Sequence, residues 1–220
     1  VQYSESEASY FIDWLDLVDT PPDRDLKNLA MQYGHGANED FAGNESKARN
    51  HRVGQREQFL VTDLSATTSY RVEAELVHLT DSAYWYVDIG SDIDKDLYEV
   101  AATQWETIFI NHFSKSEIPR VTILNTEIVG EAGYFSDIDS YPTWVHANSN
   151  QRPMVYIDPH SNKPGSNRYM SVLIHEFQHL IHNFVDEGEE AWVDEGLAEL
   201  VVRNVGYETP LERYFLMNPD

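Results

Sequence analysis

The sequence contains no cysteine among its 220 residues. Disulfides, cysteine nucleophiles and thiolate metal sites are therefore all excluded. Any metal ion must be held by histidine, aspartate or glutamate side chains. The absence of cysteine does not identify a compartment, because both secreted and cytosolic proteins can lack it.

Positive charge is also scarce. Lysine and arginine number 15 against 38 aspartates and glutamates, which gives a formal net charge of -23. Binding to nucleic acid or to anionic lipid needs a cationic surface, so we expect neither a nucleic-acid partner nor a membrane partner. The simplest interpretation of the charge is a well-hydrated acidic surface. Two more specific interpretations are adaptation to salt and additional calcium sites. No loop has the oxygen-rich spacing of a calcium site, so nothing supports the second.

Long hydrophobic runs are missing. No segment approaches the roughly 18 apolar residues that indicate a membrane-spanning helix. The first residues, VQYSESEASYF, show no basic region followed by an apolar stretch, so they do not resemble a signal peptide. Hydrophobic residues nevertheless make up 41% of the chain, enough for one sizeable core. The length fits one large domain or a domain with a small appendage.

The spacing of apolar residues changes along the chain. Apolar and polar residues alternate over 56–89, which predicts a small antiparallel sheet. Over 92–113 they recur at helical spacing, with acidic residues in the expected first turn. We expect further strands at 120–125, 130–136 and 154–158, and further helices at 169–183 and 190–204. Residues 1–55 give only weak helical spacing, at 10–17 and 25–33. The pattern as a whole predicts the α+β class.

The motif H-E-x-x-H lies in the apolar segment S-V-L-I-H-E-F-Q-H-L-I-H, with His175, Glu176 and His179 at its fixed positions. Residues four apart share one helix face, so both imidazoles can bind one zinc ion. Glu176 follows the first ligand directly and is expected beside the open coordination position. There it would act as general base towards zinc-bound water. The alternative, a metal-free core helix, would bury two imidazoles and a carboxylate without compensation.

A catalytic zinc needs a third protein ligand, and the segment W-V-D-E-G-L-A-E supplies candidates. Glu195 and Glu199 are four residues apart on one predicted helix face. We expect Glu195 to bind the metal and Glu199 to accept the outer N–H of a histidine ligand, His175 first among them. Glu190 is the alternative third ligand, and a solvated helix carboxylate is the alternative role for Glu195.

His182 lies nearly on the face of His175. A metzincin would need H-E-x-x-H-x-x-G-x-x-H, but His182 replaces the glycine and Val185 stands where the third histidine would be. That subclass is therefore rejected. We expect His182 to be a helix C-terminal residue or a residue behind the ligands, not a ligand itself.

The pairing of H-E-F-Q-H with W-V-D-E-G-L-A-E resembles the gluzincin metallopeptidases. The closer resemblance is to the hyicolysin-like bacterial neutral metallopeptidases, which also carry segments similar to A-G-Y-F-S-D-x-D-S-Y-P at 132–142 and S-N-x-R-x-M-x-Y-I at 149–157. It covers roughly residues 55–205. The resemblance implies a thermolysin-like zincin core, a zinc cofactor, hydrolysis of a polypeptide substrate and an extracellular or cell-surface location.

On this basis we expect an N-terminal segment with a small antiparallel sheet at 1–90 and a zincin-like catalytic domain at 91–220, with an incomplete C-terminal subdomain. Metallopeptidases stabilise the oxyanion with zinc and a tyrosine or histidine donor. Tyr134 is our candidate for this catalytic role. The other candidates are Tyr141, Tyr207 and Tyr214, and for each of the four the stronger interpretation is an ordinary core or surface tyrosine.

Two other classes of function remain open. The chain could be a catalytically inactive zincin-fold binding module, or a surface-assembly module in which the domain is a spacer. Glu176 speaks against the first, because a purely structural metal site does not need a general base. The second leaves the grouping of histidines and glutamates unexplained.

Overall fold

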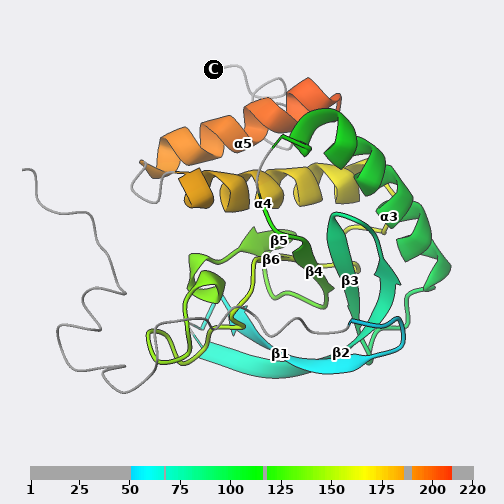
Figure 1. Ribbon diagram of the computed structural model, residues 1–220, viewed down its shortest axis with the longest axis vertical. Coiled ribbons are helices and arrows are strands. Elements are labelled where there is room, and N and C mark those ends of the chain that lie inside the picture. The colour runs from blue at the N-terminus through cyan, green and yellow to red at the C-terminus, as the bar shows by residue number, and fades with distance from the viewer. Residues whose placement is uncertain (1–50, 67, 116–117, 186–189, 210–220) are drawn as a thin grey trace, which may run out of the picture.

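Six strands form one mixed sheet in the computed structural model, which describes residues 51–66, 68–115, 118–185 and 190–209 (Figure 1). In chain order they are β1 (Arg56–Asp63), β2 (Thr68–Leu79), β3 (Ala83–Asp88), β4 (Val121–Asn125), β5 (Gly133–Phe135) and β6 (Met154–Ile157). The spatial order is β1-β2-β3-β4-β6-β5. The α+β class is confirmed. The short helices expected at 10–17 and 25–33 lie outside the described residues.

The first three strands pair antiparallel, as the alternation over 56–89 predicted. They are, however, only half of the sheet. β3 pairs with β4 in parallel, with Trp85 opposite Ile123, and β4 pairs with β6 in parallel. β5 then adds antiparallel to β6 at the far edge. The sheet is therefore continuous across residue 90, the boundary predicted between the N-terminal segment and the catalytic domain.

Among the described residues, three helices lie on one side of the sheet, with α5 packed over α4: α3 (Asp96–Ile108), α4 (Asn167–Val185) and α5 (Ala191–Val205) (Figure 1). These spans confirm the three predicted helices. A π-helical turn, η1 (Phe109–Phe113), continues α3, and a 3-10 turn, η2 (Asp137–Ser140), follows β5. α5 ends at Gly206, whose φ of 99° is readily adopted only by glycine. Among the described residues, no helix has the length and apolarity needed to cross a membrane.

The orientation of α4 is set by the core between helices and sheet. Leu173, Ile174 and Phe177 are completely buried in it. Phe177 packs edge-to-face on Trp105 of α3, with ring centroids 4.8 Å apart. At 3.6 residues per turn, burying this stripe turns His175 and Glu176 towards the rim of the core, where both remain partly exposed. The buried apolar face of α4 thereby determines the direction in which the H-E-x-x-H side chains point.

A second core lies within the curl of the sheet, and side chains there join the two sheet edges. Asn150, in the loop from η2 to β6, binds Leu60 of β1 with its side-chain amide, accepting from the backbone N–H and donating to the carbonyl, each at 2.9 Å. The Tyr134 hydroxyl on β5 accepts from the backbone N–H of Thr62 at 3.0 Å. Edge strand β1 is thus bonded through side chains to the opposite end of the sheet.

Asp139 anchors this junction from η2. Its carboxylate accepts from the Tyr156 hydroxyl at 2.6 Å and from the backbone and side-chain amides of Asn150 at 2.7 and 2.9 Å. Burial raises the pKa of Asp139 to about 6, although these hydrogen bonds oppose the shift. The bonds compensate for burying the carboxylate and fix the loop that carries Asn150.

Gly133 on β5 is expected to tolerate no larger residue. A Cβ atom there would lie 2.7 Å from a methyl of Val172 and 2.8 Å from the Tyr156 carbonyl oxygen, which is backbone and cannot move aside alone. We expect Gly133→Ala to lower the free energy of unfolding by about 1–3 kcal/mol, as overpacking typically does. Urea denaturation measures this. Gly196→Ala is the control, because a Cβ atom at Gly196 meets nothing within 4 Å. An unchanged Gly133→Ala protein would contradict the expectation.

Candidate metal centre

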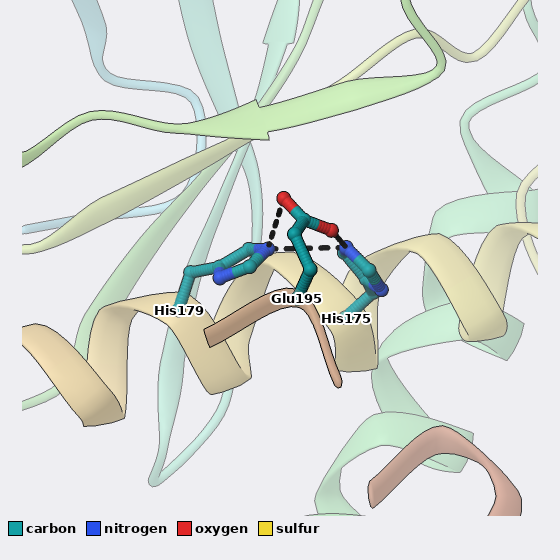
Figure 2. Close-up of side chains that lie close together, drawn as sticks. All are labelled: His175, His179 and Glu195. Carbon is teal, nitrogen blue, oxygen red and sulfur yellow. Dashed lines mark hydrogen bonds and ion pairs between the residues drawn. The ribbon is translucent and has the colours of Figure 1, made fainter. Parts of the chain in front are cut away.

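Three predicted ligands converge where α5 packs across α4. The Nε2 atoms of His175 and His179 are 3.1 Å apart. Glu195, from the second turn of α5, places one carboxylate oxygen 3.3 Å from Nε2 of His175 and the other 3.7 Å from Nε2 of His179. Figure 2 shows the two rings and the carboxylate pointing towards one another. One ligand atom from each residue lies within 4.8 Å of the others.

The donor set fits zinc. Ligands bonded at roughly 2.0–2.1 Å to a tetrahedral ion lie about 3.3 Å from each other. The distances among His175, His179 and Glu195 bracket this value. Two nitrogens and one carboxylate oxygen are also the donor types of a catalytic zinc site, which keeps its fourth position open. The side chain of Glu195 is 58% exposed, so the site can be reached from solvent.

The outer nitrogens of both imidazoles face carboxylates. Nδ1 of His179 lies 2.7 Å from Oδ2 of Asp194, a short hydrogen bond. Nδ1 of His175 lies 3.6 Å from Oε1 of Glu199, within ion-pair range but beyond hydrogen-bond length. A carboxylate only accepts, so Nδ1 of His179 must donate, and a neutral ring then turns an unprotonated Nε2 towards Glu195. This is the tautomer that binds a metal.

Burial and neighbouring charge favour neutral His175. Burial lowers the pKa of His175, and the adjacent His179 lowers it further, while Glu195 and Glu199 act in the opposite direction. A neutral imidazole is the form that coordinates metal. The same partly buried surroundings that disfavour a proton therefore favour coordination.

Glu176 lies between the ligands and edge strand β5. Its carboxylate accepts a hydrogen bond from the backbone N–H of Phe135. Burial raises the pKa of Glu176 to about 8, and Glu195 adds to the shift. A cation nearby would act against this shift by favouring the charged carboxylate. Glu176 is therefore a largely covered carboxyl group beside the predicted ligands, in a position suited to exchanging protons.

A cavity of about 200 Å³ adjoins this carboxyl group. Its walls combine small apolar side chains with hydroxyls and carboxylates. The lining residues are Glu131, Ala132, Gly133, Ser171, Val172, His175, Glu176, Glu199, Val202 and Thr209. The cavity thus begins at the edge strand β5, passes Glu176 and reaches α5. It has room for one modest side chain of a bound molecule.

Tyr134, the first of the tyrosine candidates, lies away from this group. Tyr134 stacks on Tyr156 in the core within the sheet curl, with ring centroids 4.1 Å apart, and its hydroxyl bonds to β1. Tyr207 packs against the helix-facing core just beyond α5. Tyr141 lies in the loop after η2, where its carbonyl accepts from Ser149. Tyr214 lies outside the described residues. Oxyanion stabilisation by Tyr134 would require this packing to break.

Asp194 is the residue that sequence reasoning missed. The only sequence feature that pointed to Asp194 was its position directly before Glu195 in W-V-D-E-G. No local sequence pattern indicates that its side chain contacts α4. Glu190, the alternative third ligand, lies exposed at the N-terminal end of α5.

No protein-family model matches this chain, and comparison with curated proteins gives no match either.

Proposed function

We propose that the protein is a zinc-dependent endopeptidase of the gluzincin type, with a thermolysin-like zincin core. The observation that carries the proposal is the convergence of His175, His179 and Glu195, with Glu176 beside them on α4, the helix that carries both histidines. Three ligands and an adjacent carboxyl group are what metal-assisted hydrolysis requires.

Each residue has a distinct task in this proposal. His175, His179 and Glu195 hold the ion, and Asp194 and Glu199 orient the two imidazoles. Zinc in this position would supply Lewis acidity and lower the pKa of a coordinated water to about 7. Glu176 accepts a proton from the attacking water and passes it to the departing amine nitrogen as the C–N bond breaks. Its largely covered position limits exchange of the proton with bulk solvent during this transfer.

The substrate is proposed to lie extended along β5. Among the residues that the structure describes, this strand is the last in the sheet order and pairs with β6 on one side only. An extended peptide can add to such an edge through main-chain hydrogen bonds, which makes recognition largely independent of sequence. Since the cavity opens beside Glu176, it would receive one substrate side chain close to the cleaved bond.

Purified protein supplied with zinc is expected to hold about one zinc per molecule and to hydrolyse casein. Elemental analysis gives the stoichiometry, and release of acid-soluble peptides gives the activity. Chelation should abolish hydrolysis and zinc should restore it. Lack of stoichiometric zinc would overturn the proposal. Stoichiometric zinc without hydrolysis of any of a panel of unfolded proteins would favour an inactive binding or surface-assembly module instead.

A further inference from the structure

Asp194 of α5 contacts two histidines of α4, the proposed ligand His179 and His182. Asp194 of α5 accepts from Nδ1 of His179 on Oδ2 at 2.7 Å and from Nδ1 of His182 on Oδ1 at 2.6 Å. Both imidazoles are well covered, with side chains 10% and 12% exposed, whereas that of Asp194 is 31% exposed. The carboxylate therefore lies between the two rings, with one oxygen directed to each.

This arrangement restricts Asp194 in a way that one hydrogen bond would not. A carboxylate held at a single oxygen can still rotate about its terminal bond, and solvent competes for the free oxygen. With His182 bonded to Oδ1, the direction of Oδ2 is set by a second ring on the same helix as His179. Short hydrogen bonds to an ionised acceptor are about twice as strong as neutral ones.

We propose that His182 is a positioning residue for the metal centre: by holding Asp194 it fixes the orientation and tautomer of the ligand His179. The inference rests on the proposed function, because it assumes that His179 binds zinc. It explains a polar residue in the last turn of α4 whose ring is largely covered. In this proposal α4 supplies two ligands, His175 and His179. It also supplies His182, which orients His179 by way of Asp194 on α5.

A double-mutant cycle on zinc affinity tests this inference. The variants are His182→Leu, Asp194→Ala and the pair, and the dissociation constant is measured by competition with a chromophoric chelator. We expect Asp194→Ala to weaken binding on the order of 10–100-fold, as losses behind a ligand typically do. His182→Leu should weaken it at least about threefold and by less than Asp194→Ala. If His182 acts through Asp194, the double variant should bind zinc like Asp194→Ala alone.

The cycle separates positioning from general damage to α4. A purely structural effect of His182→Leu would weaken binding equally with and without Asp194, and additivity of this kind would overturn the inference. His182→Asn, which can place an amide N–H near the position of Nδ1, should recover much of the affinity lost in His182→Leu. Equal affinity of wild type and His182→Leu would refute the inference and leave the proposed function intact. Wild type that binds no zinc would remove both.

Discussion

Glu176→Gln is expected to retain stoichiometric zinc and to lose hydrolysis by about 100- to 10,000-fold, the range over which a positioned proton acceptor contributes. The substitution keeps the shape of the side chain but removes its basicity. Glu176 is not among the three proposed ligands that converge, so the metal should remain bound. The measurement is kcat on a peptide substrate with saturating zinc, together with elemental analysis of the same preparation.

The control is Glu99→Gln, an exposed carboxylate on α3 outside the described metal centre. It should leave both kcat and zinc content unchanged. Comparable turnover in Glu176→Gln and wild type would remove Glu176 from the mechanism. Loss of zinc from Glu176→Gln would mean that the carboxylate binds the metal, and the assignment of Glu195 would then need revision.

Glu195→Ala should lose more zinc affinity than any other substitution on α5. It deletes one of the three proposed ligands, so the dissociation constant should rise by more than the roughly 10–100-fold typical of residues behind the ligands. Its side chain is 58% exposed, and removing it opens no core cavity, so the fold should remain intact. Metal competition and thermal denaturation of the metal-free protein would measure the two effects separately.

Glu199→Ala provides the comparison on the same helix face. Glu199 lies 3.6 Å from Nδ1 of His175, so its loss should weaken zinc binding only within the roughly 10–100-fold range. Equal weakening in Glu195→Ala and Glu199→Ala would leave no basis for giving them different roles. A zinc-loaded structure with the ion bonded to Glu199 or Glu190 would refute the assignment of Glu195.

Local patterns predicted the elements that carry the site. The span of α4 follows from apolar residues at helical spacing, and the proximity of His175 to His179 follows from one helical turn. The meeting of α4 with Glu195 was inferred from motif pairing, since periodicity alone does not say which helices pack together. The spacing of Glu195 and Glu199 likewise placed both on the face that the structure turns towards His175.

Local sequence patterns could not predict the features that depend on contacts between distant segments. Tyr134 was proposed as an oxyanion donor because metallopeptidases use a tyrosine or histidine for that role, but the curl of the sheet carries its hydroxyl to Thr62. The division at residue 90 followed the change in periodicity, whereas strand pairing across it depends on β3 meeting β4. Asp194 lies within reach of His182 only because α5 packs against α4. Each of these features is fixed by tertiary packing.

The side-chain bonds that tie β1 to the opposite end of the sheet also bear on self-association. An uncovered edge strand of eight residues offers a row of backbone groups to the edge of another copy. Here Asn150 occupies both backbone groups of Leu60, and Tyr134 occupies the N–H of Thr62. A second chain would have to displace all three bonds to pair along the middle of β1. We therefore expect Asn150 and Tyr134 to disfavour edge-to-edge pairing between copies. Mutual repulsion between copies that each carry a formal net charge of -23 acts in the same direction.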